Sequence, residues 1–143
     1  MIEFFVPGKP VPKARARVVR HNGITRSYTP ESTANFELLV KYAAYEAMSN
    51  QELATGPLRM NMTMCLSPPA SWSKKKSALA IEGRVLPTVK PDISNVQKSV
   101  EDAMNGVVYV DDSQLCQIVT AKCYSLQPGV RIRIERLDAE PSK

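Results

Sequence analysis

The residues best suited to chemistry lie in one stretch, Lys90–Asp112, which reads KPDISNVQKSVEDAMNGVVYVDD. Carboxylates stand at both ends of it, Asp92 near the start and Asp111-Asp112 at the finish. Mg²⁺ takes oxygen ligands in proteins, usually one or two carboxylates together with substrate phosphate and water. A metal held in this way activates water and offsets charge on a phosphate during hydrolysis. The stretch therefore predicts metal-assisted chemistry on phosphate, provided that its two ends meet in space.

The spacing within the stretch predicts how the ends could meet. Apolar residues recur at intervals of three and four, as on the buried face of a helix: Ile93, Val96, Val100, Ala103 and Met104. We expect this helix to run from Asp92 to Met104 and to end at Asn105-Gly106, because both types readily adopt the left-handed conformation. The apolar run Val107–Val110 then delivers the second pair of carboxylates, which can converge with the first although twenty residues separate them.

Each of these residues also has a purely structural interpretation. Asp92 is suited to cap a helix N-terminus. Ser94 and Gln97 match a capping box, in which the serine accepts from the backbone and the glutamine reaches back. Lys98 lies one turn after Ser94, but lysine on a helix is commonly just solvated. Asp111-Asp112 could be turn residues. Spacing alone leaves both kinds of interpretation open.

Positive charge is concentrated in two places. The net charge is +5, from 19 Lys and Arg against 14 Asp and Glu. Within the first 26 residues, Glu3 is the only acid and the cations are Lys9, Lys13, Arg15, Arg17, Arg20 and Arg26. A second cluster is Lys74-Lys75-Lys76. Clustered cations favour a nucleic-acid-binding surface, with Lys13, Arg15, Arg17, Arg20 and Lys74 to Lys76 as its candidates, whereas a solvated basic face is the alternative.

The remaining elements follow from periodicity and from turn residues. We predict a strand at 2–6, an extended basic arm or loop at 9–29, a helix at 31–48, a strand at 58–66, a helix at 71–81 capped by Ser71, and a frayed tail at 138–143. Two further runs, 115–124 and 130–137, are joined by Gln127-Pro128-Gly129 and predict an antiparallel hairpin. The alternating methionines of 58–66 indicate core packing, and Trp72 either stacks on a base or anchors its helix.

Length and composition set the class of protein. At 143 residues, 43% hydrophobic and 23% charged, the chain is typical of one globular domain spanning 1–143. No apolar run approaches the ~20 residues that cross a bilayer, and the first residues do not have the pattern of a secretory leader, so we expect a cytoplasmic protein with no membrane partner. The cysteines Cys65, Cys116 and Cys123 form no CxxC pair and are expected to be buried, reduced thiols.

Three segments together carry a resemblance to a known family. They are PDISNVQK (91–98), DAMNG (102–106) and VDDSQ (110–114), and the terminal PGKPVPKARAR and PGVRIRIE add to them. In order and spacing they resemble the RusA-type Holliday junction resolvases. That family has an Asp-x-Asp-Asn segment, a lysine four residues beyond its second Asp, and a downstream Asp-Asp followed by a small residue and Gln. The similarity covers most of the chain.

The resemblance implies an α/β (α+β) fold, in which helices pack on a mixed β-sheet, and a homodimer. It implies an endonuclease that resolves four-way DNA junctions by paired symmetric nicks, with Mg²⁺ as cofactor and Mn²⁺ able to substitute. Recombination or repair, in a phage or prophage setting, is the role that it suggests. By the same resemblance Asp92 and Asp112 are metal ligands, Asp111 is a secondary candidate, and Lys98 is a catalytic cation beside the scissile phosphate.

Ser94 departs from the family pattern, because it stands where the second Asp of Asp-x-Asp is expected. Serine keeps an oxygen but loses a negative charge and some reach, so metal affinity and cleavage should both fall. Three explanations stay open: another carboxylate takes its place, with Asp111, Glu101 and Asp102 as candidates; the protein binds junctions without cutting them; or the serine is an engineered change. We predict retained but weakened cleavage.

Two other classes of function compete with an endonuclease. One is a junction- or branched-DNA-binding protein whose cations hold phosphates without chemistry. The other is a structural or protein-interaction domain with ordinary solvated charge. Steeply salt-dependent DNA binding separates the first two classes from the third, and metal-dependent nicking separates the endonuclease from the binding protein.

Overall fold

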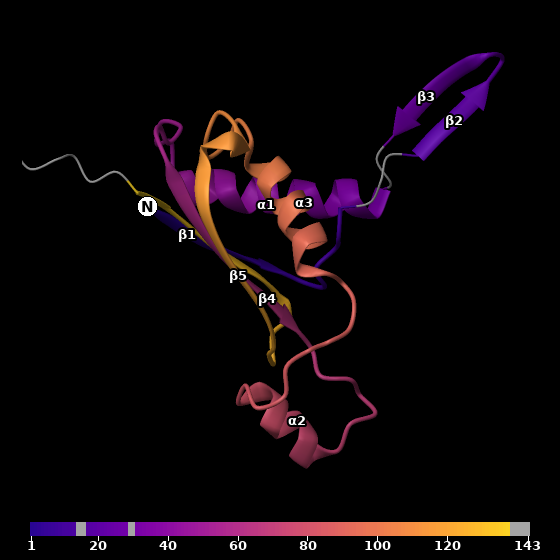
Figure 1. Ribbon diagram of the computed structural model, residues 1–143, viewed down its shortest axis with the longest axis vertical. Helices are drawn as coiled ribbons and strands as arrows, with labels where there is room; N and C mark the ends of the chain where they lie inside the picture. The colour runs from indigo at the N-terminus through magenta and orange to yellow at the C-terminus, as the bar shows by residue number, and fades with distance from the viewer. Residues whose placement is uncertain (14–16, 29–30, 138–143) are drawn as a thin grey trace, which may run out of the picture.

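The computed structural model describes residues 1–13, 17–28 and 31–137. It confirms the expected fold class: helices pack on a four-stranded mixed sheet, and a two-stranded hairpin stands apart (Figure 1). In chain order the elements are β1 (Ile2–Pro7), β2 (Arg17–His21), β3 (Ile24–Tyr28), α1 (Glu31–Met48), β4 (Leu58–Leu66), α2 (Lys74–Ile81), α3 (Ile93–Met104), the short 3-10 helix η1 (Asp112–Gln114), β5 (Leu115–Tyr124) and β6 (Gly129–Arg136). Arg15 and the tail 138–143 lie outside the described residues.

The central strand of the sheet is β4. The strand order is β1-β6-β4-β5, and β4 runs parallel to β5 and antiparallel to β6. Its alternating sequence buries every second side chain, and Leu58, Met60, Met62 and Met64 are all inaccessible to solvent. Core packing therefore accounts for these methionines, as predicted.

Helices α1 and α3 cover one face of the sheet and close the main core. The amphipathic pattern predicted for α3 is confirmed, because Val96, Val100 and Met104 are fully buried. Phe36 and Val40 of α1 belong to the same cluster, together with the inward side chains of β1, β4 and β6. This packing fixes the orientation of α3 and leaves its polar face toward solvent.

The predicted hairpin of the last two strands is wrong. β5 and β6 lie on opposite sides of β4 and do not pair with each other. The connecting residues pack against β1 instead: the Gly8 amide donates to the Pro128 carbonyl at 3.0 Å. Gly129 lies so close to Phe5 and to the Val6 carbonyl that a Cβ there would clash with both. The Pro-Gly pair therefore marks a close approach to β1 rather than a tight turn between paired strands.

The basic arm contains regular structure that was not predicted. β2 and β3 form an antiparallel hairpin, and its turn residues Asn22 and Gly23 both have positive φ, 49° and 76°. Asn-Gly between strand-like runs is the strongest short-range signal for a hairpin turn, so the sequence carried the information. Figure 1 shows this hairpin projecting away from the sheet beyond the start of α1. Over its described part the arm is thus a two-stranded hairpin and not an extended loop.

A second, smaller core anchors α2 at one end of the sheet. Trp72 packs edge-on against Tyr124 of β5, with ring centroids 5.2 Å apart, and the ammonium of Lys76 lies 4.0 Å from the centre of the Trp72 ring. These contacts support the anchoring interpretation of Trp72. The cap of α2 is Ser73 and not Ser71, because the Lys76 amide donates to the Ser73 hydroxyl at 3.1 Å.

The expectation of three buried thiols holds only in part. All three cysteines are free, but Cys116 is exposed, because it lies on the edge strand β5 and points away from the core. Cys65 and Cys123 are register partners in the β4–β5 pair, with sulfurs 3.9 Å apart. Burial, reinforced by Cys123, raises the pKa of the Cys65 thiol to about 11. In the described part of the chain, no helix is long and apolar enough to cross a membrane.

Candidate active site

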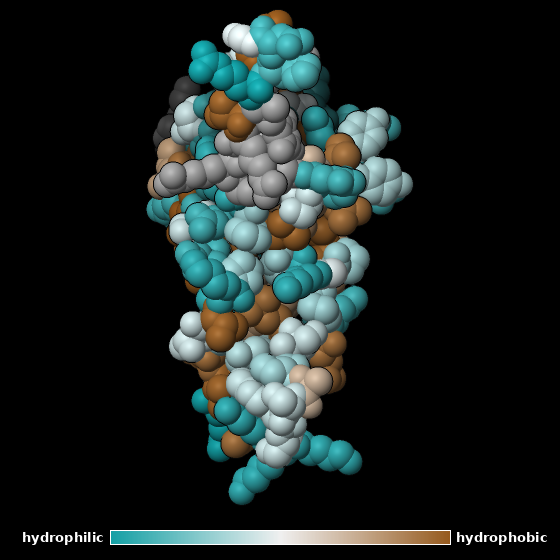
Figure 2. Space-filling view, turned by 90° about the vertical axis from the view of Figure 1, so that its right-hand side faces the viewer, coloured by the Kyte–Doolittle hydropathy of each residue, from teal (hydrophilic) through white to brown (hydrophobic). Residues whose placement is uncertain are grey.

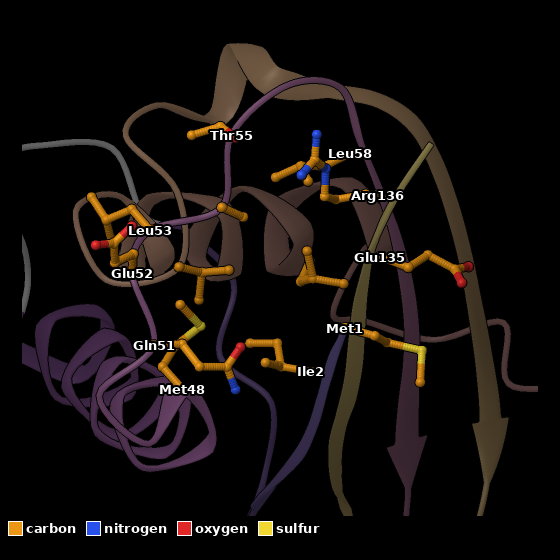
Figure 3. A pocket seen from close by; sticks show the side chains of 13 residues that line it. Met1, Ile2, Met48, Gln51, Glu52, Leu53, Thr55, Leu58, Glu135 and Arg136 are labelled. Carbon is orange, nitrogen blue, oxygen red and sulfur yellow. The ribbon is translucent and has the colours of Figure 1, made fainter. Parts of the chain in front are cut away.

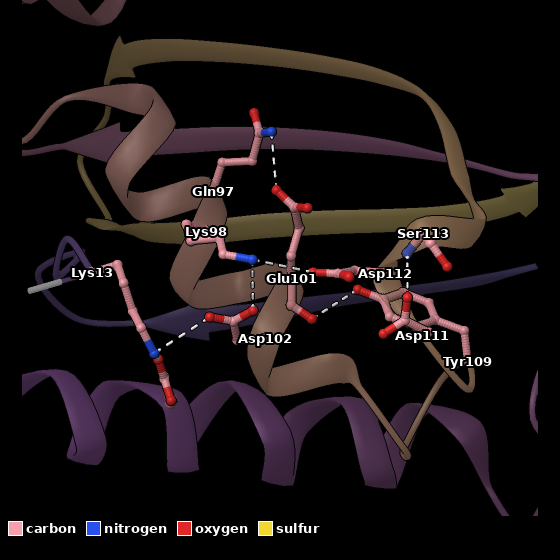
Figure 4. Close-up of polar contacts among 10 residues, drawn as sticks. Lys13, Gln97, Lys98, Glu101, Asp102, Tyr109, Asp111, Asp112 and Ser113 are labelled. Carbon is pink, nitrogen blue, oxygen red and sulfur yellow. Dashed lines mark hydrogen bonds and ion pairs between the residues drawn. The ribbon is translucent and has the colours of Figure 1, made fainter. Parts of the chain in front are cut away.

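Lys98 joins helix α3 to the carboxylate of Asp112 at the far end of the acidic stretch. Its Nζ lies 3.4 Å from Oδ2 of Asp112 and 3.1 Å from Oδ1 of Asp102 (Figure 4). Asp102 follows Lys98 by one turn on α3, whereas Asp112 comes from η1, beyond the loop that ends α3. The side chain of Asp112 is 22% exposed and that of Lys98 is 55% exposed, so the pair lies at the surface and is open to a ligand.

The apolar run Val107–Val110 forms the loop between α3 and η1 and is built from turns. Tyr109 is fully buried in it, and the Tyr109 hydroxyl donates to the backbone carbonyl of Glu101 at 2.9 Å. Burial, followed by the negative charges of Glu101 and Asp112, raises the pKa of this phenol. Gly106, with φ 77°, supplies the left-handed position that ends α3, while Asn105 does not adopt it. The buried tyrosine thus ties the loop to α3 and sets the place from which Asp112 projects.

Asp111 caps η1, whereas its structural interpretation was that of a turn residue. Its Oδ2 accepts from the Ser113 amide at 3.0 Å, and the Gln114 side chain accepts from the Asp111 amide at 3.2 Å, which completes a capping box. Hydrogen bonds from Ser113 lower the pKa of the Asp111 carboxyl, and the charge of Lys98 acts in the same direction. Gln114 also donates to the carbonyl of Ala54 at 3.0 Å and so holds the turn against the preceding loop. Asp111 is therefore engaged locally, and Asp112 faces Lys98.

Asp92 occupies the N-cap position of α3, but its carboxylate makes no capping hydrogen bond. The side chain is 51% exposed, and Oδ2 lies 3.4 Å from Nζ of Lys90. Ser94 lies exposed in the first turn. Its proposed capping box is absent, because the N-cap is Asp92, two residues earlier, and Gln97 donates to Glu101 at 3.0 Å instead. The side-chain oxygens of Asp92 and Ser94 thus do not cap the backbone amides at the start of α3.

Lys13, a candidate DNA contact, lies in an ion-pair network with the acidic stretch. Its Nζ is 2.6 Å from Glu37 of α1 and 3.3 Å from Asp102. The hydrogen bond with Glu37, followed by the contact with Asp102, raises the pKa of Lys13. Charges therefore alternate from Glu37 through Lys13, Asp102 and Lys98 to Asp112 (Figure 4). The spacing of Lys98 and Asp102 could have indicated their pairing, whereas nothing in the sequence pointed to Glu37.

The side chains of the acidic stretch differ in how freely they can bind a metal ion. No cluster of three or more His, Cys, Asp and Glu side chains positioned for a metal occurs in the described ranges. The carboxylates of Asp92 and Asp112 still supply hard oxygen ligands that no backbone hydrogen bond occupies. Mg²⁺ commonly binds through one or two carboxylates and completes its shell with substrate phosphate and water. Each of these carboxylates therefore offers the kind of oxygen that a divalent ion takes, with substrate phosphate and water as further ligands.

Two candidate basic surfaces lie at opposite ends of the molecule. Arg20 and His21 are exposed on the hairpin, where Arg17 begins β2, and Lys74, Lys75 and Lys76 are exposed on α2. Figure 2 shows hydrophilic side chains gathered at both of these ends, the hairpin at the top and α2 at the bottom. The structure does not bring these two clusters together, and the acidic stretch lies between them on α3.

Comparison with known proteins agrees with the resemblance. The family model for endodeoxyribonuclease RusA matches residues 7–135. The uncharacterized protein YqaN of Bacillus subtilis (strain 168) is 35% identical over 140 residues, which is 96% of this chain and 98% of that protein. The matched region contains the hairpin, the whole acidic stretch, strands β4 and β5, and all of β6 but its last residue. The chain belongs to the RusA endodeoxyribonuclease family, the RusA-type Holliday junction resolvases.

Proposed function

We propose that this protein is a homodimeric endonuclease that resolves four-way DNA junctions by paired symmetric nicks, with Mg²⁺ as its ion and Mn²⁺ as a substitute. Membership of the RusA family supports the nuclease class and a divalent-metal requirement. The observation that carries the proposal is the ion pair of Lys98 with Asp112 at 3.4 Å, which brings a cation of α3 to the carboxylate at the far end of the acidic stretch. A single domain spanning 1–143 and a role in DNA recombination or repair belong to the same proposal.

The chain's own residues would divide the work at the scissile phosphate. Asp92 and Asp112 would hold the ion, with Ser94 as a neutral oxygen beside them and Asp111 in a supporting place. When bound, a divalent ion supplies Lewis-acid chemistry, because it neutralises charge on the phosphate and makes water more acidic. Lys98 would stabilise the negative charge that develops on the phosphate, since a preorganised cation acts most strongly on charge that appears during the reaction.

Binding of the junction would involve the hairpin, α2 and a second copy of the chain. The exposed cations Arg20 and Lys74 to Lys76 can neutralise DNA phosphates. A two-fold dimer would present one acidic site to each of two opposed strands. An exposed apolar face on α1 supports a contact between subunits, because Leu38, Tyr42 and Tyr45 share one side of the helix and are each more than 60% exposed.

The experiment that tests this function is cleavage of an end-labelled synthetic four-way junction in Mg²⁺, in Mn²⁺ and in EDTA, beside a linear duplex of the same sequence. We expect paired nicks on the junction alone, and none in EDTA. Equal cutting of the linear duplex would contradict junction specificity. No retardation of any DNA on a native gel would instead favour a structural or interaction domain.

A junction-binding protein without cleavage remains the second candidate, and Ser94 is the observation that favours it. Its exposed position beside Asp92 offers one neutral oxygen where the family has a carboxylate. A retarded junction without product in either metal would support this candidate. Ser94→Asp should then restore nicking, whereas Ser94→Asn, which adds bulk without charge, should not.

Substitutions of Lys13 and Arg20 should separate paired from unpaired cations. The Lys13 ammonium already has two carboxylate partners, whereas Arg20 is exposed on the hairpin. We expect Arg20→Met to reduce the slope of log K against log salt by about 1, as loss of one phosphate contact does. Lys13→Met should change that slope by much less. Titration of fluorescent junction between low and moderate salt measures both, and equal slopes for the two variants would contradict the distinction.

A further inference from the structure

A pocket of about 320 Å³ opens beside Asp92. Its walls are the segment that follows β1, residues 9–13, and the entry to α3, residues 90–95. The lining consists of three lysines, three prolines, one carboxylate and one carboxamide: Asp92 supplies the carboxylate and Asn95 the carboxamide. The volume is at the lower end of the range that takes small ligands.

The walls of this pocket are fixed before any ligand binds. The Lys13 amide donates to the Asn95 carbonyl at 2.8 Å and joins one wall to the other. The Thr33 hydroxyl of α1 donates to the Pro12 carbonyl at 3.2 Å. Pro10 and Pro91 are buried, and the ring of proline restricts the backbone. A preformed pocket binds its ligand without the cost of ordering its own walls.

The lining has the chemistry that a nucleotide requires. Lys9 and Lys90 lie exposed at the pocket and offer ammonium groups to phosphate, Lys90 from an exposed pair with Asp92, while Lys13 is held by Glu37 and Asp102. The proline rings supply apolar surface for a base. The exposed carboxamide of Asn95 has two N–H donors and one acceptor, which is the group that proteins use to read the edge of a base. No single one of these features would identify the ligand, but together they fit a phosphate joined to a base.

We propose that this pocket takes one unpaired nucleotide of the DNA strand that is cut, next to the scissile phosphate, and that Asn95 reads the edge of its base. The inference rests on the proposed function, because Asp92 is both a wall of the pocket and a candidate ligand of the ion. A base must leave the helical stack to enter this pocket, and this costs least where stacking is already interrupted, as at a branch point. In this proposal Asn95, the Asn of the Asp-x-Asp-Asn pattern, determines base specificity.

A second pocket provides the matched control. It has a volume of about 300 Å³ and lies between the end of α1 and the edge formed by β1 and β6 (Figure 3). Its charged lining residues are Glu52, Glu135 and Arg136, so it does not attract phosphate as the lysine-lined pocket does. Gln51 stands in its wall as Asn95 stands in the other, with an exposed carboxamide.

The test uses a four-way junction pool in which the nucleotides around the branch point are randomised. The full-length protein, Asn95→Ala and Gln51→Ala are compared by sequencing the nicked products. We expect the protein to favour one base over another directly beside the nick by about 5-fold to 100-fold, the range of a bidentate contact to a base. Asn95→Ala should reduce this preference several-fold, with total nicking lowered less than tenfold, whereas Gln51→Ala should keep both. The backbone bond to Lys13 is retained in the alanine variant, so the pocket wall stays in place.

A binding measurement keeps the inference testable if cleavage is weak. The junction carries 2-aminopurine at each branch-point nucleotide in turn, and fluorescence is followed in EDTA. We expect the 2-aminopurine fluorescence to rise several-fold at one position when the junction is saturated with protein. This rise should be lost in Asn95→Phe, which fills the pocket, and retained in Gln51→Phe. Three results would overturn the role of the pocket and leave the proposed function standing. They are nicking without base preference, an unchanged preference in Asn95→Ala, and a bound junction without a fluorescence rise. Failure to bind junctions at all would overturn both.

Discussion

Replacement of Asp112 by Asn is expected to lower junction nicking by about 10²-fold to 10³-fold or more, and to leave junction binding within a few-fold of its original strength. Asparagine preserves the shape of the side chain but removes the charge that would hold a divalent ion, and removal of one preorganised electrostatic group costs a factor of this size. The variant should fold, because Asp112 is a surface residue whose contact is to Lys98. Single-turnover nicking and native gel titration of one junction measure the two quantities.

The matched control for Asp112 is its neighbour Asp111. Its carboxylate accepts from the Ser113 amide and caps η1, so Asp111→Asn keeps an oxygen for that bond. We expect a fall in nicking of about tenfold or less. Asp92→Asn should match Asp112→Asn, since neither carboxylate is occupied by a backbone amide. Equal defects at Asp111 and Asp112, or loss of junction binding together with nicking at Asp112, would contradict the assignment of Asp112 to the ion.

The sequence allowed the chemistry to be anticipated better than the topology. The 3.6-residue period placed α3, because its apolar face is confirmed by three fully buried side chains: Val96, Val100 and Met104. Helix spacing also explains why Lys98 meets Asp102. The contact between Lys98 and Asp112 depends on the loop that Tyr109 anchors, and its path could be expected only in outline.

Strand pairing was not predictable from local patterns. The two C-terminal runs have the right alternation for strands, but alternation does not say which strands are neighbours. β4 lies between them, buried on one face and paired along both edges. This arrangement depends on contacts between distant parts of the chain, which no short segment encodes. The β2–β3 hairpin is the opposite case, since Asn22-Gly23 is a local signal that should have been recognised.

The carboxylates named as substitutes for the acid missing at Ser94 are already engaged. Asp102 is shared between Lys13 and Lys98, Asp111 is committed to its cap, and Glu101 accepts from Gln97. Each of the three candidate carboxylates from the sequence therefore has a partner in the folded protein. Recruitment of any of them to an ion would have to break such a contact, and this physical cost agrees with the prediction of weakened cleavage.

Replacement of Lys98 by Met is expected to lower nicking by about 10²-fold, with little change in the affinity for junctions. Lys98 is held by Asp102 and Asp112 near the acidic site, so its charge is in place before the phosphate arrives. Lys41→Met is the control for loss of one positive charge, because Lys41 is exposed on α1 and is not part of the network. Lys98→Arg should recover part of the rate, since arginine keeps the charge but not the compact ammonium.

The pH dependence provides a separate check on the role of Lys98. The hydrogen bond with Asp102, followed by the contacts with Asp112, raises the pKa of Lys98. Because this pKa is raised, the ammonium and the stability that its ion pairs contribute are fully present below the ordinary lysine pKa. Both are lost only as pH rises through the raised pKa. Lys98 therefore stays a cation and not a base throughout the neutral range. Deprotonation of Lys98 should therefore not lower the nicking rate of the original protein between pH 7 and 9. The ratio of this rate to the nicking rate of Lys98→Met should stay constant across that interval. A ratio that rises with pH would mean that Lys98 acts by losing its proton, against the role inferred from its two carboxylate partners.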